Sequence, residues 1–333
     1  MRYAFALAAA CLLVSPLLAA DPPQTTAPSG AAPALPPVDV QSKPLVGNLH
    51  LLPDQRELDE APYRYTLFTG RVKDESAYGK AWFPEPLLTP EMDLEYREMQ
   101  VRWFHTEKPN HYFDEAKLEA EMSFGALTVE LELPYQRNFE RETDEDGETE
   151  TNLEQGLSRV ELGFRYPFLQ YVSPDAVFDY TLVGAFEVAV PTNLHFSKDF
   201  ELSPRLYNLL RIGDHFSVQL SVGSETMIGP DRGGTSTLIY GAAFGYNIPH
   251  DDLPIPGVLT TIPILEVSGE HVLDGESEGP FPTAHFGSAG VRFNMESFWI
   301  AQPRIGLAYV FPLDAGAREE MHWGIIASCI FEF

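Results

Sequence analysis

Residues 159–170 read RVELGFRYPFLQ, and apolar and polar side chains alternate along this stretch. Val160, Leu162 and Phe164 fall on one face of an extended chain, whereas Glu161 falls on the other. Successive side chains of a β-strand point to opposite sides, so a period of two predicts a strand with one apolar face and one charged face. The stretch is about twice as long as the roughly 5–6 residues that are usual for strands of soluble domains.

The same alternation recurs from residue 93 to the C-terminus, in segments separated by Gly, Pro, Asp and Asn. About twelve such segments can be distinguished, at 94–106, 115–124, 126–140, 156–169, 176–191, 200–211, 214–228, 235–249, 260–273, 284–295, 299–312 and 319–333. No segment shows the pattern of an amphipathic helix. We therefore expect residues 93–333 to form one all-β domain.

Two architectures contain antiparallel strands of this kind, a secreted sandwich and a transmembrane barrel. The length of the segments matches the roughly 9–11 residues that a tilted strand needs to cross a bilayer. Aromatic residues collect near the segment ends, as in the interfacial girdles of membrane barrels: Trp103, Tyr135, Phe168, Tyr171, Tyr246, Trp299, Phe311 and Trp323. A sheet in lipid has to close on itself to satisfy its backbone. The pattern favours a transmembrane antiparallel up-and-down β-barrel of about 12 strands.

The connections between segments alternate in length, as expected for a barrel with both chain ends in the periplasm. Short connections are predicted on the periplasmic side, for example at 124–126 and 211–215. Long connections are predicted on the outer side, among them RETDEDGETETNLEQ at 141–155. The long PHDDLPIPGVLT at 249–260 breaks this alternation, which indicates either a real exception or a miscount of the strands nearby.

The N-terminal part has three predicted sections. Residues 1–20 have a basic start, an apolar run and small residues at the end, which is typical of a cleaved signal peptide. Residues 21–44 are rich in Pro, Ala, Ser and Thr and are expected to be a disordered periplasmic tether. Residues 45–92 are mixed and broken by prolines, so we expect an irregular segment that is periplasmic or plug-like.

The chain ends on SCIFEF at 328–333, an apolar tail on a protein with formal net charge -27. As a last barrel strand it places Ser328, Ile330 and Glu332 on the inner face and has to pair with the first strand, near 94–106. The terminal Phe333 resembles the signal by which outer-membrane barrels are recognised by their assembly machinery. We therefore expect the barrel-assembly machinery and the lipids of a Gram-negative-type outer membrane, including lipopolysaccharide, as partners.

The predicted inner faces carry charged side chains, because a charge that faces lipid near the membrane centre costs several kcal/mol. The candidates for the lining of the lumen are Glu130, Glu132, Glu161, Arg165, Glu187, Arg205, Glu225, Glu266, Arg292 and Arg304. They are consistent with a charged pore for a small solute. They are equally consistent with a packed interior that is closed by its own ion pairs. Acids outnumber arginines, which favours cationic or neutral solutes if the pore conducts.

Three short motifs carry a family resemblance: VELELPYQR at 129–137, GLSRVELGFRYPFL at 156–169 and GAFEVAVPTN at 184–193. Together they resemble the MetA-pathway of phenol degradation family of outer-membrane proteins. One departure is GLSR, which stands where the family usually has Gly-Asp before the second motif. The resemblance extends over roughly residues 95 to 333. It implies an outer-membrane barrel that acts as a channel for small, often hydrophobic compounds, and it supplies no catalytic residues.

Other functions are less well supported. Two His-x-Ser pairs, His195 to Ser197 and His215 to Ser217, resemble those of barrel-borne lipid hydrolases, but neither has the usual flanking Asn motif. The acidic stretch at 144–148 lacks the spacing of a calcium loop, so we expect a solvated surface. Removal of the signal peptide leaves a single cysteine, Cys329, and the nine histidines are scattered. We expect no metal, no cofactor and, given the acidity, no nucleic acid.

The leading hypothesis is therefore an outer-membrane channel or transporter for small molecules that has no enzymatic activity. The second is a closed structural or adhesion barrel whose external loops are functional. The third is a barrel-borne lipid hydrolase. The identity of a solute cannot be read from the sequence.

Overall fold

The structure is a computed structural model of the whole chain, and the residues that it describes fall within Ser42–Phe333. The described residues are 63–66, 71–74, 84–90, 97–124, 127–143, 149–172, 178–192, 198–213, 215–230, 234–274, 280–298 and 301–332. The predicted signal peptide, the predicted tether and Phe333 lie outside them. So do His195, Ser197 and the acidic stretch at 144–148.

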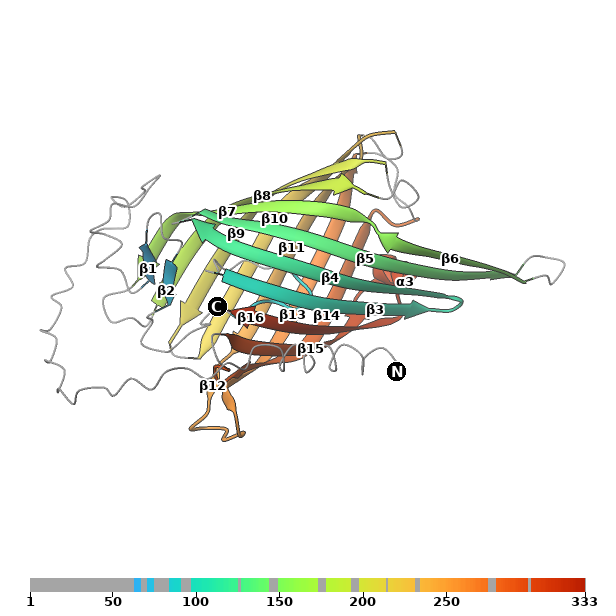
Figure 1. Cartoon of the computed structure of the whole chain (residues 1–333). Helices are drawn as coiled ribbons and strands as arrows, with labels where there is room; N and C mark the ends of the chain where they lie inside the picture. Colours follow the sequence, from blue (N-terminus) through green and yellow to red (C-terminus); the bar gives the residue numbers. More distant parts are fainter. Residues whose placement is uncertain are drawn as a thin grey trace, which may run out of the picture. The chain divides into compact units, whose positions relative to one another are not determined.

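Twelve antiparallel strands close into a barrel, which confirms the predicted fold class and strand number. They are β3 (Arg97–Lys108), β4 (His111–Phe124), β5 (Leu127–Thr143), β7 (Arg159–Val172), β8 (Phe178–Pro191), β9 (Phe200–Ile212), β10 (Phe216–Ile228), β11 (Ser236–Tyr246), β13 (Val258–Asp274), β14 (Thr283–Met295), β15 (Gln302–Pro312) and β16 (Trp323–Glu332). The last strand pairs with the first, from Trp323 opposite Glu107 to Glu332 opposite Glu98. The pairing of β11 with β13 leaves no free edge between them. Figure 1 shows the strands as a tilted wall.

Burial alternates along the barrel strands with the period that the sequence predicts. In β15, Arg304 is 1% exposed while Leu307 is 54% exposed. The outer surface is apolar, with exposed side chains on most of the strands: Met99, Leu118, Leu131, Leu162, Phe186, Leu206, Leu220, Phe244, Leu265 and Tyr309 are examples. Apolar side chains outside and buried charges inside are the arrangement of a barrel surrounded by lipid.

Four further strands of the described chain are not among the twelve that close the barrel. β1 (Tyr63–Thr66) and β2 (Arg71–Asp74) pair only with each other. β6 (Thr149–Leu157) precedes β7 and pairs with the outer part of β5. β12 (Ile248–Pro249) pairs with the start of β13.

Several predicted boundaries were wrong. The stretch at 141–155 is mostly strand rather than loop, because β5 and β6 extend the barrel wall as a hairpin. The long connection at 249–260 is a real exception, built around the short β12. The final strand was predicted from residue 319, but it begins at Trp323 after a helix, α3 (Ala315–Glu320), that the sequence pattern did not predict. No helix in the described part of the chain is both long and apolar enough to cross a membrane.

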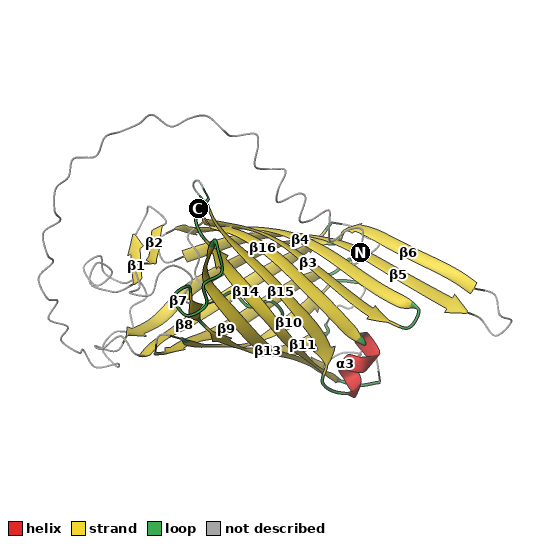
Figure 2. Ribbon diagram, turned by 90° about the horizontal axis from the view of Figure 1, so that it is seen from below, coloured by secondary structure: helices red, strands yellow, loops and turns green. Residues whose placement is uncertain are grey.

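The two ends of the barrel differ. The short-turn end holds both Arg97, where β3 begins, and Glu332, where β16 ends. The long-loop end holds α3 and the β5–β6 hairpin, which extends beyond the other strands in both views (Figures 1 and 2). This is the alternation of short and long connections that the sequence indicated.

Candidate functional site

The lumen has two unlike sides. The charged wall is the inner face of β3–β5 and β7–β10, where acidic and basic side chains stand in rows on neighbouring strands. The plug wall is the inner face of β11 and β13–β16, where small and apolar residues prevail. The name refers to a third component, the segment Pro84–Pro90, which bends at Leu87–Thr89 and contacts this wall; it is here called the plug.

Ion pairs that cross between strands hold the charged wall together at its centre. Arg165 of β7 is 2% exposed and contacts Glu121 of β4, and its Nη2 lies 2.9 Å from Glu130 Oε2 of β5. Lys117 of β4 lies 2.9 Å from Glu119 on the same strand. A buried cation with a single acidic partner is costly, and two partners reduce that cost. This part of the wall is therefore a packed network rather than a row of free charges.

A second group of ion pairs lies on β7–β10. Arg205 Nη2 is 3.1 Å from Glu187 Oε2 of β8 and 3.0 Å from Glu225 Oε1 of β10. Arg159 contacts Glu201 on β9, and its Nε lies 3.8 Å from Glu161. Because each guanidinium bridges two carboxylates, its position is fixed from both sides.

Three acids of this wall come close enough to suggest a metal site. Glu119, Glu130 and Glu132 each offer a carboxylate oxygen, and these oxygens lie within 4.8 Å of one another. The ammonium group of Lys117 contacts both Glu119 and Glu132. A cation is thus already supplied by the chain, so the geometry gives no reason to place a metal there.

The plug is fixed to the plug wall by its own backbone. Its three prolines have no N–H group. The backbone N–H groups of Leu87, Leu88 and Thr89 donate hydrogen bonds of 2.8–3.0 Å to the carboxylate of Glu266, on β13. The same carboxylate accepts hydrogen bonds from the hydroxyl groups of Thr89, at 3.0 Å, and Ser288, at 3.1 Å. Because Glu266 receives five donors, it binds the segment much as an anion is bound by a turn of exposed amides.

A carboxylate of the plug completes the attachment at a second point. Glu85 is fully buried; its Oε2 lies 3.3 Å from Nε of Arg292, and its Oε1 contacts Arg304. Arg292 Nη2 also donates to the Pro86 carbonyl at 3.3 Å, and Arg304 Nη2 lies 2.7 Å from Glu332. The plug therefore interacts with the wall in two ways: its Glu85 carboxylate contacts two buried arginines, and its N–H groups donate to the carboxylate of Glu266.

The seat of the plug is shaped by glycines that face it. A Cβ atom on Gly290 would lie 2.8 Å from Leu87, and one on Gly306 would lie 2.5 Å from the same side chain. Both distances are shorter than packed carbon atoms allow, so a side chain at either position would force Leu87 to move. Leu87 is fully buried in an apolar cluster that also contains Phe286 and Val310.

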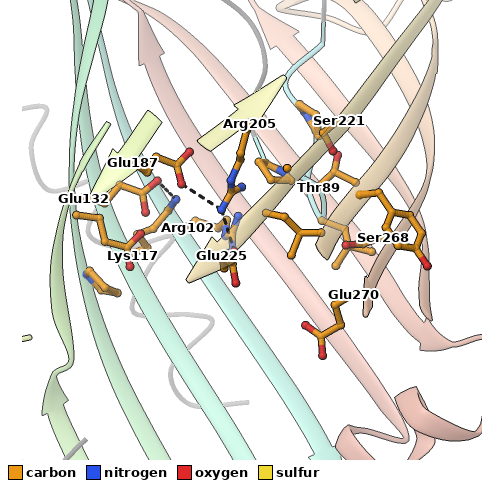
Figure 3. A pocket seen from close by; sticks show the side chains of 18 of the residues that line it. Thr89, Arg102, Lys117, Glu132, Glu187, Arg205, Ser221, Glu225, Ser268 and Glu270 are labelled. Atoms are coloured by element: carbon orange, nitrogen blue, oxygen red, sulfur yellow. Dashed lines mark hydrogen bonds and ion pairs between the residues drawn. The ribbon is translucent and has the colours of Figure 1, made fainter. Parts of the chain in front are cut away.

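A cavity of about 300 Å³ remains between the plug and the charged wall. Leu88, Thr89, Ile239 and Phe286 are among the residues on its plug side. Its charged side chains are Arg102, Lys117, Arg205, Glu115, Glu119, Glu130, Glu132, Glu161, Glu187, Glu225 and Glu270. Figure 3 shows Lys117, Glu132, Glu187 and Arg205 converging on one side of this space, with Thr89 and Ser221 on another.

At the long-loop end, α3 packs into the mouth of the barrel. Ala317 of the helix and Met321, which directly follows it, belong to the same apolar cluster as Leu87. Asp314 caps the helix by accepting the Ala317 N–H at 2.9 Å, and its other carboxylate oxygen lies 2.5 Å from Nδ1 of His285. Burial acts to raise the pKa of Asp314, but these hydrogen bonds outweigh it and hold that pKa below its ordinary value.

The pKa of Glu320, the last residue of α3, is shifted in the opposite direction to that of Asp314. Partial burial and the neighbouring carboxylate of Glu270 raise the pKa of Glu320 to about 8. The ammonium of Lys108 opposes this rise and also donates to the carbonyl of Glu319 at 3.0 Å. The carboxyl group of Glu320 therefore ionises near pH 8, at the mouth of the barrel.

The predicted lumen residues lie in two places. Glu130, Glu132, Glu161, Arg165, Glu187, Arg205 and Glu225 lie in the charged wall, and Glu266, Arg292 and Arg304 contact the plug. The sequence reasoning missed Lys117, although the alternation in 115–124 places it on the same face as Glu119. It also missed Glu85, for which no periodic signal exists.

The second His-x-Ser pair does not form a catalytic arrangement. His215 Nδ1 lies 2.7 Å from the carbonyl oxygen of Asn247, and its ring stacks on Tyr246. Ser217 is buried on the inner face of β10, where its hydroxyl oxygen lies against Gly245. The two side chains have separate surroundings, so the structure gives the hydrolase hypothesis no support.

No protein-family model and no curated protein matches the sequence. The resemblance to the phenol-degradation family therefore remains a hypothesis. Among solved structures, an outer membrane channel from Pseudomonas putida F1 aligns with a TM-score of 0.46 at 12% identity, over 75% of this chain and 99% of that one. The NanC porin aligns with a TM-score of 0.44 at 9% identity, over 71% of this chain and 98% of the porin. These likenesses are distant, and the fold assignment rests on the strand pairing of this chain.

Proposed function

We propose that this chain is an outer-membrane channel for small solutes, and that the plug, Pro84–Pro90, closes it. The observation that carries the proposal is that a lumen cavity is bounded on one side by a separate segment rather than by the wall. A twelve-stranded barrel is intermediate between small barrels filled by side chains and porins with open channels, so one short segment is enough to close it.

The contacts of the plug support a closure that can be released. They include hydrogen bonds to Glu266, hydrogen bonds from Gln219 and Arg292 to the Pro84 and Pro86 carbonyls, ion pairs of Glu85 and the burial of Leu87. The segment contains no cysteine, so no disulfide ties it to the wall, and the barrel strands pair with one another without it. The wall can therefore stay intact when the plug leaves.

The charge of the cavity supports a preference among solutes. Eight glutamates and three basic side chains line it. Such an excess of acids raises the local concentration of cations and lowers that of anions. We infer that neutral and cationic solutes pass more readily than simple anions.

The competing function is a closed barrel that acts through its external parts. The burial of Glu85 and Leu87 favours it, because both side chains are fully enclosed in the closed state. The two functions differ in whether release of the plug opens a passage.

Conductance in planar bilayers distinguishes them. We expect purified wild-type protein to show rare openings, and the double variant Glu85→Ala and Glu266→Gln to raise the open probability at least about tenfold, since it removes the ion pairs of Glu85 and weakens the hydrogen bonds that Glu266 accepts from the plug. The matched control is Glu154→Gln on β6, an exposed acid outside the lumen. A folded double variant that conducts no more than wild type would support the closed barrel.

We also propose that the barrel-assembly machinery inserts this chain into the outer membrane. A barrel with an apolar exterior, preceded by a predicted signal peptide at 1–20 and a tether at 21–44, fits the outer membrane, with lipopolysaccharide and other lipids as neighbours. Insertion by the barrel-assembly machinery then depends on Phe333. Deletion of Phe333 is expected to lower the amount of protein in the outer-membrane fraction more than the total amount made; equal losses in both would contradict this role.

A further inference from the structure

The two arginines behind the plug form a site that is built for a carboxylate. Arg292 and Arg304 are the largest fully buried side chains of the described structure, and both contact Glu85. Arg304 also lies 2.7 Å from Glu332 and 3.9 Å from Glu98, and Arg292 lies 3.3 Å from Glu85 and donates to the Pro86 carbonyl at 3.3 Å. The one carboxylate that contacts both arginines, that of Glu85, belongs to a segment outside the barrel strands.

Release of the plug therefore has a specific consequence. When Glu85 leaves, a buried guanidinium loses a carboxylate partner, and such a loss is strongly unfavourable. The exchange of Glu85 for another carboxylate avoids that loss, because the new group meets the same donors. A solute that supplies a carboxylate consequently stabilises the open state relative to the closed one.

We propose that Arg292 and Arg304 form a binding site for the carboxylate of a small solute, and that Glu85 occupies this site when the barrel is closed. The proposal rests on the proposed function, since it treats the plug as a releasable closure. In it, the carboxylate of the solute replaces that of Glu85 on the two arginines and thereby favours the open state.

The rest of the lumen narrows the class of solute. A simple anion that comes from the long-loop end has to pass the cavity, whose lining has five more acids than bases (eight against three). A solute that also carries an ammonium group is attracted by these acids and still presents a carboxylate to the arginines. The matching class is therefore a small zwitterion with separated amino and carboxyl groups.

Binding to the full-length protein in detergent, measured by calorimetry, tests the site directly. The probes are 6-aminohexanoate, hexanoate and hexylamine, which share a chain length and differ in charge. In the variant Glu85→Ala the site is vacated, so we expect 6-aminohexanoate to bind at least about tenfold more tightly than to wild type. Hexanoate is expected to bind the variant more weakly than 6-aminohexanoate does, and hexylamine is expected to bind both proteins alike.

A second substitution assigns the effect to the arginines. The double variant Glu85→Ala and Arg292→Gln is expected to lose the gain, while Glu154→Gln is expected to behave as wild type. If Glu85→Ala does not fold, Glu85→Gln keeps the volume of the side chain, and its smaller gain is expected to depend on Arg292 in the same way.

Three results would overturn the proposal: no gain in either folded Glu85 variant, a gain that survives Arg292→Gln, or binding of hexanoate as tight as that of 6-aminohexanoate. The binding experiment is independent of conductance. Tight, Arg292-dependent binding in a barrel that never conducts leaves the site in place and removes the channel function. Conductance without such binding supports the channel function and removes the carboxylate site.

Discussion

The two walls of the lumen contain the same kinds of charged residue but use them differently. In the charged wall, Arg165 and its acidic partners all belong to barrel strands, so these ion pairs are part of the barrel itself. In the plug wall, Arg292 and Glu266 contact a segment that is not a strand. The first arrangement stabilises the barrel, and the second holds a segment that is not one of the barrel strands. Loss of a charge should therefore affect stability at one wall and closure at the other.

The largest effect is expected in the charged wall. The change Arg165→Gln leaves Glu121 and Glu130 buried without their shared cation, which should destabilise the barrel by about 3–5 kcal/mol. Urea unfolding of the protein in lipid vesicles, followed by tryptophan fluorescence, measures it. The control is Arg141→Gln on the exposed part of β5. If Arg165→Gln leaves the barrel stable but raises its open probability, the charged wall also controls closure, which would contradict the difference proposed between the two walls.

The next effect is expected at the plug. The change Leu87→Ala removes a fully buried side chain and should weaken the docking of the plug by about 2–5 kcal/mol, with little change in the stability of the barrel. Open probability in planar bilayers should rise on the order of 30-fold or more. Leu131→Ala, on the lipid-facing surface, is the matched control. Unfolding at lower urea without any change in conductance would place Leu87 in the core of the barrel rather than in a plug.

A smaller effect is expected at the mouth. The change Asp314→Ala removes the N-cap of α3 and should destabilise the docked helix by about 0.5–2 kcal/mol. Faster hydrogen exchange of the amides at 315–320 would show this. Asp251→Ala, in an exposed turn at the other end, should leave the same amides unchanged. If Asp314→Ala exchanges as slowly as wild type, the apolar contacts of Ala317 and Met321 alone hold the helix.

The smallest effect is expected from pH. Glu320 has a pKa of about 8, above the ordinary value of a glutamate, so its proton favours the docked helix at low pH. That contribution is lost as the pH rises through about 8, where Glu320 ionises beside Glu270. Exchange of the α3 amides, corrected for the intrinsic effect of pH, should become a few-fold faster between about pH 7 and about pH 9. In Glu320→Gln the corrected rate should stay flat; an unchanged slope would assign the effect to another group.

The fold could be read from the sequence because its signal is local and repeated. Each strand, such as β7, alternates lipid-facing and lumen-facing residues, and the bilayer imposes this pattern on every strand independently. The prediction failed where the chain leaves the bilayer. The helix α3 is only six residues long, which is too short for periodicity to show, and it is held by the cap at Asp314 and by packing in the mouth.

The site was only partly predictable for a related reason. Alternation assigns Glu130, Arg165 and Arg292 to the inner face, but it cannot say which acid meets which base, since partners on different strands are far apart in the sequence. Nor does it reveal that Gly290 and Gly306 make room for Leu87, because a glycine in a strand pattern has no characteristic partner.

The sequence by itself determined the closed barrel, the number of its strands and the charged character of its interior. These features follow from a period-two alternation that recurs in segments long enough to cross the bilayer. Only the tertiary structure decided that Pro84–Pro90 lies against Glu266, Arg292 and Arg304. That contact joins residues about 180 to 220 positions apart, and its hydrogen bonds use backbone amides that every sequence contains. No local pattern encodes such a contact.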